Sequence, residues 1–135
     1  MCTNVFELWE NVPLFSGAHT PTLDYYKAEN RKGNGTVIIL PGGAYRGRAA
    51  HEGKGYAEYL NAQGLDCFVL QYRCAPTRFP YPLLDARRAM RYVRANAEKY
   101  GISFPQRSRI RFWNSMPKKN RGLTSLMQIS VEKTN

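Results

Sequence analysis

The stretch VIILPGGAYRG, Val37 to Gly47, decides the interpretation of the fold, because an unbroken apolar run leads directly into a proline and two glycines. A continuous run rich in β-branched residues is typical of a strand covered on both faces, as in a parallel sheet. The Pro-Gly-Gly sequence after it predicts a sharp turn. Since glycine lets another group approach the backbone closely, this turn is the first candidate for a ligand-binding loop.

Hydrophobic periodicity and turn residues on either side of this stretch predict two further strands and two helices. The strands are expected over residues 21–28 and 66–73, and the helices over residues 51–63 and 83–100. Gly64 and Gly101 follow the helices in the position where helices commonly end, and the proline-rich segment 75–82 predicts a loop. Strand, helix, strand, helix is the alternation of an α/β protein with a doubly wound, mostly parallel sheet.

The helical patterns also predict which side chains face the core. Tyr56, Tyr59 and Leu60 are expected on one side of the first helix, and we interpret His51 as a capping or packing residue. In the second helix, Asp85 is expected to pair with Arg88 one turn on, at the solvated surface. The remaining residues of that helix divide into an apolar face (Ala86, Ala89 or Met90, Val93, Ala97, Tyr100) and a polar face (Arg87, Arg91, Arg94, Glu98).

Composition narrows the class of protein. With 135 residues, 43% of them hydrophobic, the chain is expected to form one small globular domain or part of one. Three cysteines without close spacing predict neither a disulfide framework nor a zinc site, so no metal and no cofactor is expected. No leader-like N-terminus and no long apolar run is visible, which predicts a cytoplasmic protein that does not contact a membrane.

The net charge of +10 is unevenly distributed. Residues 1–100 have 13 Lys/Arg against 9 Asp/Glu, a net of +4, whereas residues 101–135 have 7 against 1, a net of +6. This break predicts two parts, residues 1–102 and a divergent basic tail over residues 103–135. Nucleic-acid binding through that tail is one hypothesis. An irregular, disordered basic tail is the interpretation that its unpatterned composition favours.

Three kinds of site could use the glycine turn. A phosphate loop requires G-x-x-x-x-G-K-[ST], and GRAAHEGKG has one intervening residue too many and lacks the hydroxyl. A dinucleotide fingerprint requires G-x-G-x-x-G after the strand, a spacing that PGGAYRG does not have. An oxyanion hole, in which free N–H groups face the developing charge of an acyl intermediate, fits the sequence. A tight turn without any ligand stays open as the alternative.

The linked segments VIILPGGAYRG, LQYRCAP and LLDARRA, within residues 21–102, resemble the first half of an α/β-hydrolase-fold esterase. They are most similar to bacterial acetyl-xylan or feruloyl esterase-like (BD-FAE-like) members of the esterase/lipase group. The resemblance implies that Gly43 and Ala44 supply oxyanion N–H groups, that Gly42 allows the turn, and that a small ester is the substrate. It also implies a set of residues around the pocket mouth: Tyr45, Arg46, Tyr72 and Arg73. Ordinary packing at the strand end is the alternative role for Tyr72 and Arg73.

The catalytic part of the family pattern is missing. The strand expected to lead to the nucleophile is Arg109–Trp113, but the residues after it contain no G-x-S-x-G, and Ser115 is only a weak candidate. Both histidines lie earlier in the chain, and a serine without a base is a poor nucleophile. We therefore expect a truncated or frame-disrupted esterase with little or no activity. A slip upstream of Phe112 is one hypothesis, and a non-catalytic binding module is another.

Truncation has a structural consequence of its own. A sheet that stops after about its third parallel strand leaves an apolar edge exposed. The sequence therefore predicts self-association or partial folding.

Overall fold

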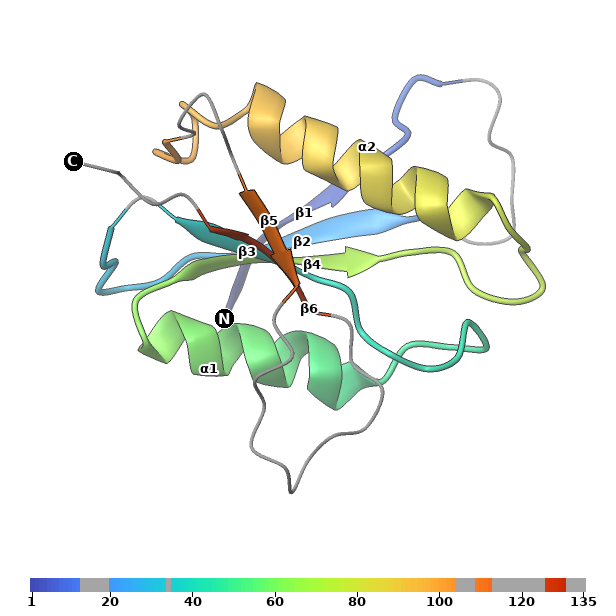
Figure 1. The fold of residues 1–135 in the computed structure, drawn as a ribbon, viewed down its shortest axis with the longest axis horizontal. Coiled ribbons are helices and arrows are strands. Elements are labelled where there is room, and N and C mark those ends of the chain that lie inside the picture. The colour runs from blue at the N-terminus through green and yellow to red at the C-terminus, as the bar shows by residue number, and fades with distance from the viewer. Residues whose placement is uncertain (13–19, 34, 104–108, 113–125, 131–135) are drawn as a thin grey trace.

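The computed structural model describes residues 1–12, 20–33, 35–103, 109–112 and 126–130. Within these ranges the strands form one six-stranded sheet in the order β1-β2-β4-β3-β6-β5 (Figure 1). The strands are β1 (Cys2–Glu7), β2 (Thr22–Tyr26), β3 (Thr36–Ile39), β4 (Asp66–Gln71), β5 (Arg109–Phe112) and β6 (Leu126–Ser130). A π-helical turn η1 (His51–Gly55) runs into α1 (Tyr56–Ala62), and α2 (Tyr81–Ala95) follows β4.

The sheet is the middle of three layers, with α1 on one face and α2 on the other (Figure 1). Alternation along β3 explains this arrangement, because successive side chains of a strand point to opposite faces. Ile38 packs in the core on the α2 side with Phe68 and Val93. Val37 and Ile39 pack in the core on the α1 side with Ala57. All four residues of β3 are buried, which confirms the prediction of a strand covered on both faces.

Strands β3 and β4 are parallel and joined through η1 and α1, which confirms an α/β fold. Among the described strands they are the one parallel pair, since every other pairing is antiparallel. The sheet is therefore mixed, and the expectation of a mostly parallel sheet is wrong. The reason is that β1 and β2, before the βαβ unit, form a hairpin-like pair whose inner strand runs antiparallel to β4.

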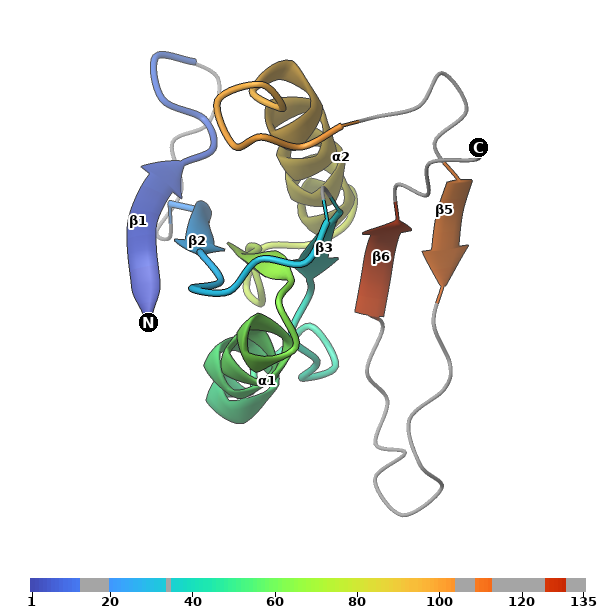
Figure 2. The same cartoon turned by 90° about the vertical axis from the view of Figure 1, so that its left-hand side faces the viewer.

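The C-terminal part of the sheet also differs from expectation. The strand expected over Arg109–Trp113 is β5, but it lies at the outer edge, antiparallel to β6 and separated from β3 (Figure 2). β6 pairs antiparallel with β3, placing Ile38 opposite Met127. The edge of β3 is thus paired with β6. The expectation of an irregular basic tail is wrong for the parts of it that form β5 and β6. The proposed division at residue 102 stays a prediction.

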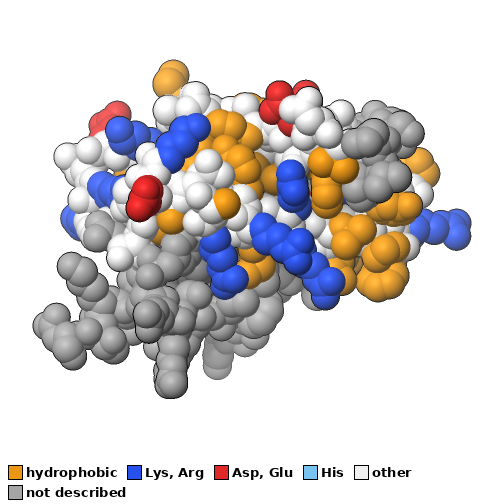
Figure 3. All heavy atoms as spheres, turned by 90° about the horizontal axis from the view of Figure 1, so that it is seen from above, with side chains coloured by type: hydrophobic (Ala, Val, Ile, Leu, Met, Phe, Trp, Pro, Cys, Tyr) orange, Lys and Arg blue, Asp and Glu red, His pale blue; other side chains and the backbone are white. Residues whose placement is uncertain are grey.

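The helices match their predicted places with shifted ends. α2 begins at Tyr81, with Pro82 in its first turn where no amide donor is required, and it ends at Ala95, before the predicted end. The predicted polar face of the α2 region is exposed, and Figure 3 shows Lys and Arg side chains lying among hydrophobic ones on this side. In α1 the buried residues are Ala57 and Leu60, whereas Tyr59 is 64% exposed. Its predicted core position is wrong because the helix is turned toward the Ala57 side.

A buried carboxylate fixes the first residue of β4. The Asp66 carboxylate accepts hydrogen bonds from the Tyr25 hydroxyl at 2.9 Å and from the Ala28 amide at 2.8 Å, and Arg31 lies 3.4 Å away. Burial first, and then the hydrogen bond to Asp66, raise the pKa of Tyr25 above its ordinary value. Arg31 also donates to the carbonyls of Tyr100 and Gly101, so this charge cluster ties β2 and β4 to the turn after α2.

Thiol reactivity is expected to report this core. Cys67 and Cys74 are buried, and burial raises the pKa of the Cys67 thiol to about 12, whereas Cys2 is partly exposed. Because the thiolate is the reactive form, a disulfide-exchange reagent at pH 8 should modify one thiol in the folded chain and three in concentrated urea. Spectrophotometric titration measures both numbers. Rapid reaction of all three thiols without urea would show that the core is open in solution.

Candidate active site

The loop after β3 has an unusual backbone. Three consecutive residues have positive φ, with values of 150° at Gly43, 51° at Ala44 and 59° at Tyr45. Non-glycine residues adopt this conformation at a cost, so two in succession indicate a loop whose shape is imposed by its surroundings. No residue with a side chain fits at position 43, because its Cβ atom would lie 2.2 Å from the carbonyl oxygen of Gly47.

Hydrogen bonds within the loop set the direction of its peptide groups. The Gly42 carbonyl accepts from the Ala49 amide at 2.8 Å, and the Gly43 carbonyl accepts from the Arg46 amide at 3.0 Å. In a planar trans peptide the N–H of the next residue points opposite to the carbonyl. The N–H groups of Gly43 and Ala44 are therefore directed away from the bonds that close the loop.

These two amides have no hydrogen-bond acceptor in the part of the chain that the structure describes. Both residues are exposed. The Gly42 amide, in contrast, donates to Oε2 of Glu52 at 2.6 Å. Of the three amides of Gly42, Gly43 and Ala44, the first is therefore bonded to Glu52 and the next two face outward, as an oxyanion hole requires. A ligand-free turn with solvated amides has the same geometry and stays the alternative.

The loop is fastened to the end of β4. The Tyr45 carbonyl accepts from the Ala75 amide at 2.7 Å, and the Tyr72 hydroxyl donates to the Pro41 carbonyl. Arg48 donates to the Gln71 side chain at 2.9 Å and to the Tyr72 carbonyl. Burial raises the pKa of Tyr72, which keeps its hydroxyl protonated as a donor. The outward amides of the loop thus lie beside the carboxyl end of the neighbouring strand.

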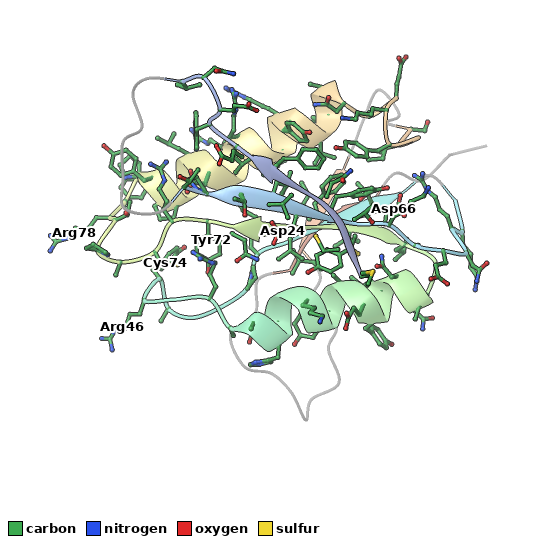
Figure 4. The ribbon with its side chains drawn as sticks, turned by 180° about the vertical axis from the view of Figure 1, so that it is seen from behind. Asp24, Arg46, Asp66, Tyr72, Cys74 and Arg78 are labelled. Carbon is green, nitrogen blue, oxygen red and sulfur yellow. The ribbon has the colours of Figure 1, made fainter. Side chains whose placement is uncertain are left out.

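The four residues expected at the pocket mouth separate into two pairs. Tyr45 is 66% exposed, and Arg46 extends from the loop into solvent (Figure 4). Tyr72 and Arg73 are buried, and the Tyr72 ring packs edge-on against Tyr45 with centroids 6.2 Å apart. The structure places Tyr45 and Arg46 beside the free amides, and it gives Tyr72 and Arg73 partners inside the protein.

The partner of Arg73 is Asp85, which corrects one sequence-based expectation. Asp85 is fully buried and accepts from the Arg73 amide and guanidinium at 2.8–3.0 Å and from the Trp9 indole at 2.8 Å. The predicted surface pair with Arg88 is wrong, because Arg88 donates to the Leu8 carbonyl and lies over the Trp9 ring. Asp85 is spaced four residues from Ala89 and eight from Val93, so the sequence already placed it on the apolar face of the helix.

The described residues contain no complete set of catalytic side chains. His51 neither caps nor packs, since its side chain is 83% exposed, Nε2 lies 4.0 Å from Oε1 of Glu52, and the helix has no side-chain cap. Ser115 lies outside the described residues. No cluster of three potential metal ligands occurs in the described part of the chain.

Comparison with known proteins assigns this loop and its surroundings to a family. The model of the family described as BD-FAE matches residues 23–113, which include the loop, both anchoring strands and α2. The chain belongs to the BD-FAE family. It is 40% identical over 67 residues to Esterase LipC of Mycobacterium tuberculosis, a match that covers 48% of this chain and 17% of the relative. The match therefore spans less than a fifth of that relative's length.

Solved structures of hydrolases have a similar fold. An acetyl ester-xyloside bifunctional hydrolase from Caldicellulosiruptor lactoaceticus is similar with a TM-score of 0.64 and 37% identity, covering 74% of this chain and 39% of that one. MGS-M1, an α/β hydrolase from a deep-sea metagenome, is similar with a TM-score of 0.55 and 26% identity, covering 76% and 43%. The fold is that of α/β-hydrolase esterases.

Among the described residues no helix has the length and hydropathy needed to cross a bilayer.

Sequence reasoning missed both Arg48 and Glu52 in this site. Glu52, which binds the Gly42 amide, is the acidic residue in the first turn of the helix that follows the loop. An acidic residue in a first helical turn is commonly explained by the helix dipole, and that explanation concealed its contact with the loop.

Proposed function

We propose that residues 1–102 carry the oxyanion-binding half of a carboxylic-ester hydrolase site. The observation that supports this most directly is the pair of outward, unbonded amides at Gly43 and Ala44 after β3. In acyl transfer, negative charge develops on the former carbonyl oxygen, and two fixed N–H donors stabilise it without reorganising. The family's esterase members favour an acyl ester as the substrate.

The relatives' chemistry supports a proposal for the substrate class. The structurally similar hydrolase from Caldicellulosiruptor lactoaceticus is described as acting on acetyl esters and xylosides. We extend the acetyl ester part of that description to this chain, so a small acyl ester, including acetylated carbohydrate, is the proposed substrate. Tyr45 and Arg46, exposed beside the free amides, would contact the alcohol side of such an ester.

The 135-residue polypeptide is proposed to lack turnover by itself. Its sequence contains no G-x-S-x-G, and no histidine follows Ser115. Loss of a nucleophile and base pair lowers turnover by a factor of about a million in the enzyme where it has been measured. The oxyanion amides would then bind without completing the reaction, which is also the non-catalytic binding alternative.

Hydrolysis of p-nitrophenyl acetate tests this proposal. We expect the purified chain to release p-nitrophenol no faster than its Ser115→Ala variant and than the urea-unfolded chain, with absorbance followed over hours. A rate above both controls that disappears with Ser115→Ala would contradict the proposed inactivity and identify Ser115 as a nucleophile. A rate that persists in Ser115→Ala would place the nucleophile elsewhere in the chain.

A further inference from the structure

Glu52 makes a contact that the oxyanion chemistry itself does not require. Its side chain is 15% exposed and its Oε2 atom accepts the Gly42 amide at 2.6 Å. A hydrogen bond from a backbone amide to a carboxylate is charge-assisted and about twice as strong as a neutral one. The acceptor comes from η1, so this bond joins the first turn of the helix to the first peptide of the glycine loop.

The approach of the helix to the loop depends on Gly53. Gly53 is buried, and a Cβ atom there would lie 3.1 Å from Val69 Cγ1 and 3.3 Å from Pro41 Cγ. Contacts this short would require η1 and these two side chains to move apart by a few tenths of an ångström. With glycine, the backbone of η1 comes close enough for the neighbouring Glu52 to reach Gly42.

The loop residue that Glu52 binds is held from both sides. The Gly42 amide donates to the Glu52 side chain, and the Gly42 carbonyl accepts from the Ala49 amide. The Ala49 carbonyl in turn accepts from the backbone amide of Glu52 at 3.0 Å. The Gly42 carbonyl belongs to the same planar peptide as the Gly43 N–H. Fixing Gly42 at both its polar groups therefore fixes the direction of the first outward amide.

We propose that Glu52 is a positioning residue for the oxyanion amides. It acts through Gly42: the carboxylate binds the first amide of the loop and so fixes the outward direction of the Gly43 amide, and the bond from the Arg46 amide to the Gly43 carbonyl then directs the Ala44 amide. The proposal rests on the proposed function of the loop. Glu52 is not a general base here, because the carboxylate oxygen nearest the loop is already occupied by the Gly42 amide.

Amide NMR of the full ¹⁵N-labelled chain, titrated with sodium acetate as the anionic probe, tests the proposal. In the unchanged chain, acetate should shift the Gly43 and Ala44 amide resonances. Glu52→Ala should weaken the acetate affinity measured at those two amides by about tenfold, the size expected from one charge-assisted hydrogen bond. Glu52→Gln keeps an acceptor without the charge, so its affinity should lie between the two.

Glu58→Ala is the matched control. Glu58 lies in α1, which continues from η1, its side chain is 47% exposed, and it pairs with Lys54 at 3.7 Å. This variant removes the same charge and should leave the acetate response unchanged. Urea unfolding of every variant gives its folded fraction, so a general loss of stability is separated from a loss of loop geometry.

The outcomes distinguish the two levels of the proposal. Absence of any acetate response at Gly43 and Ala44 in the unchanged chain would overturn the proposed function together with this inference. A normal response in both Glu52 variants would overturn only the inference. If Glu52→Ala does not fold, Glu52→Gln decides: an acetate affinity equal to that of Glu58→Ala contradicts the positioning role, and a weakened one supports it.

Discussion

Replacing Asp85 by alanine is expected to lower the free energy of unfolding by about 3–5 kcal/mol, the range measured when one partner of a buried ion pair is removed. Asp85 is fully buried and the Arg73 side chain is 6% exposed, so the substitution leaves a guanidinium without its counter-charge in the interior. It also removes the acceptor for the Arg73 amide and for the Trp9 indole. Urea unfolding followed by tryptophan fluorescence measures the change, because Trp9 reports the same cluster.

Two further variants test the cause of that loss. Glu98→Ala removes an exposed carboxylate near the end of the same helix and should change the unfolding free energy by about 0.5 kcal/mol or less. The double variant Arg73→Met with Asp85→Leu removes both charges and should recover part of the stability that Asp85→Ala loses. An Asp85→Ala variant as stable as Glu98→Ala would show that the pair is not buried in solution.

Substituting Gly43 by alanine is expected to have the second large effect, confined to the loop. The new Cβ atom would lie 2.2 Å from the Gly47 carbonyl oxygen, on a residue whose φ of 150° disfavours any side chain. The loop must therefore rearrange, at a cost of about 1–3 kcal/mol in unfolding free energy. The Gly43 and Ala44 amides should lose their response to acetate, because their direction depends on the bonds that close the loop.

Gly47→Ala provides the control for Gly43→Ala in the same loop. A Cβ atom at Gly47 meets no other atom within 4 Å, so this variant should keep both the unfolding midpoint and the acetate response. NMR titration and urea unfolding of the two variants together separate loop geometry from the general effect of adding a methyl group. Equal behaviour of the two variants would show that the loop does not depend on the backbone of Gly43.

The local parts of the fold could be predicted because their signals are local. β3 was evident from the apolar run Val37–Leu40, which overlaps it, and α1 and α2 were evident from three- and four-residue spacing. The start of α2 lies earlier than predicted because proline is compatible with a first helical turn. The candidate oxyanion loop was found for the same reason, since glycines directly after an apolar strand limit what the backbone there can do.

The predictions that were wrong concern contacts between residues far apart in the sequence. Trp9 reaches Asp85 across 76 positions, and no spacing pattern in the sequence connects them. The same is true of β6, whose pairing with β3 brings together segments separated by about ninety residues. A single sequence lists the groups that need partners, but which distant group supplies each partner is decided by tertiary packing.

Strand β4 has a carboxylate fixing each of its ends. At the start of the strand, the Asp66 carboxylate accepts hydrogen bonds from the Ala28 amide and the Tyr25 hydroxyl. Just beyond the end of the strand, the Arg73 amide donates to the Asp85 carboxylate. Sliding the strand by one residue would turn its core side chains to the opposite faces, move Asp66 away from its two donors and take the Arg73 amide away from Asp85. The register of β4 is therefore fixed at the centre of the sheet, and the glycine loop, which is bonded to Tyr72 and Ala75 just beyond this strand, is fixed with it.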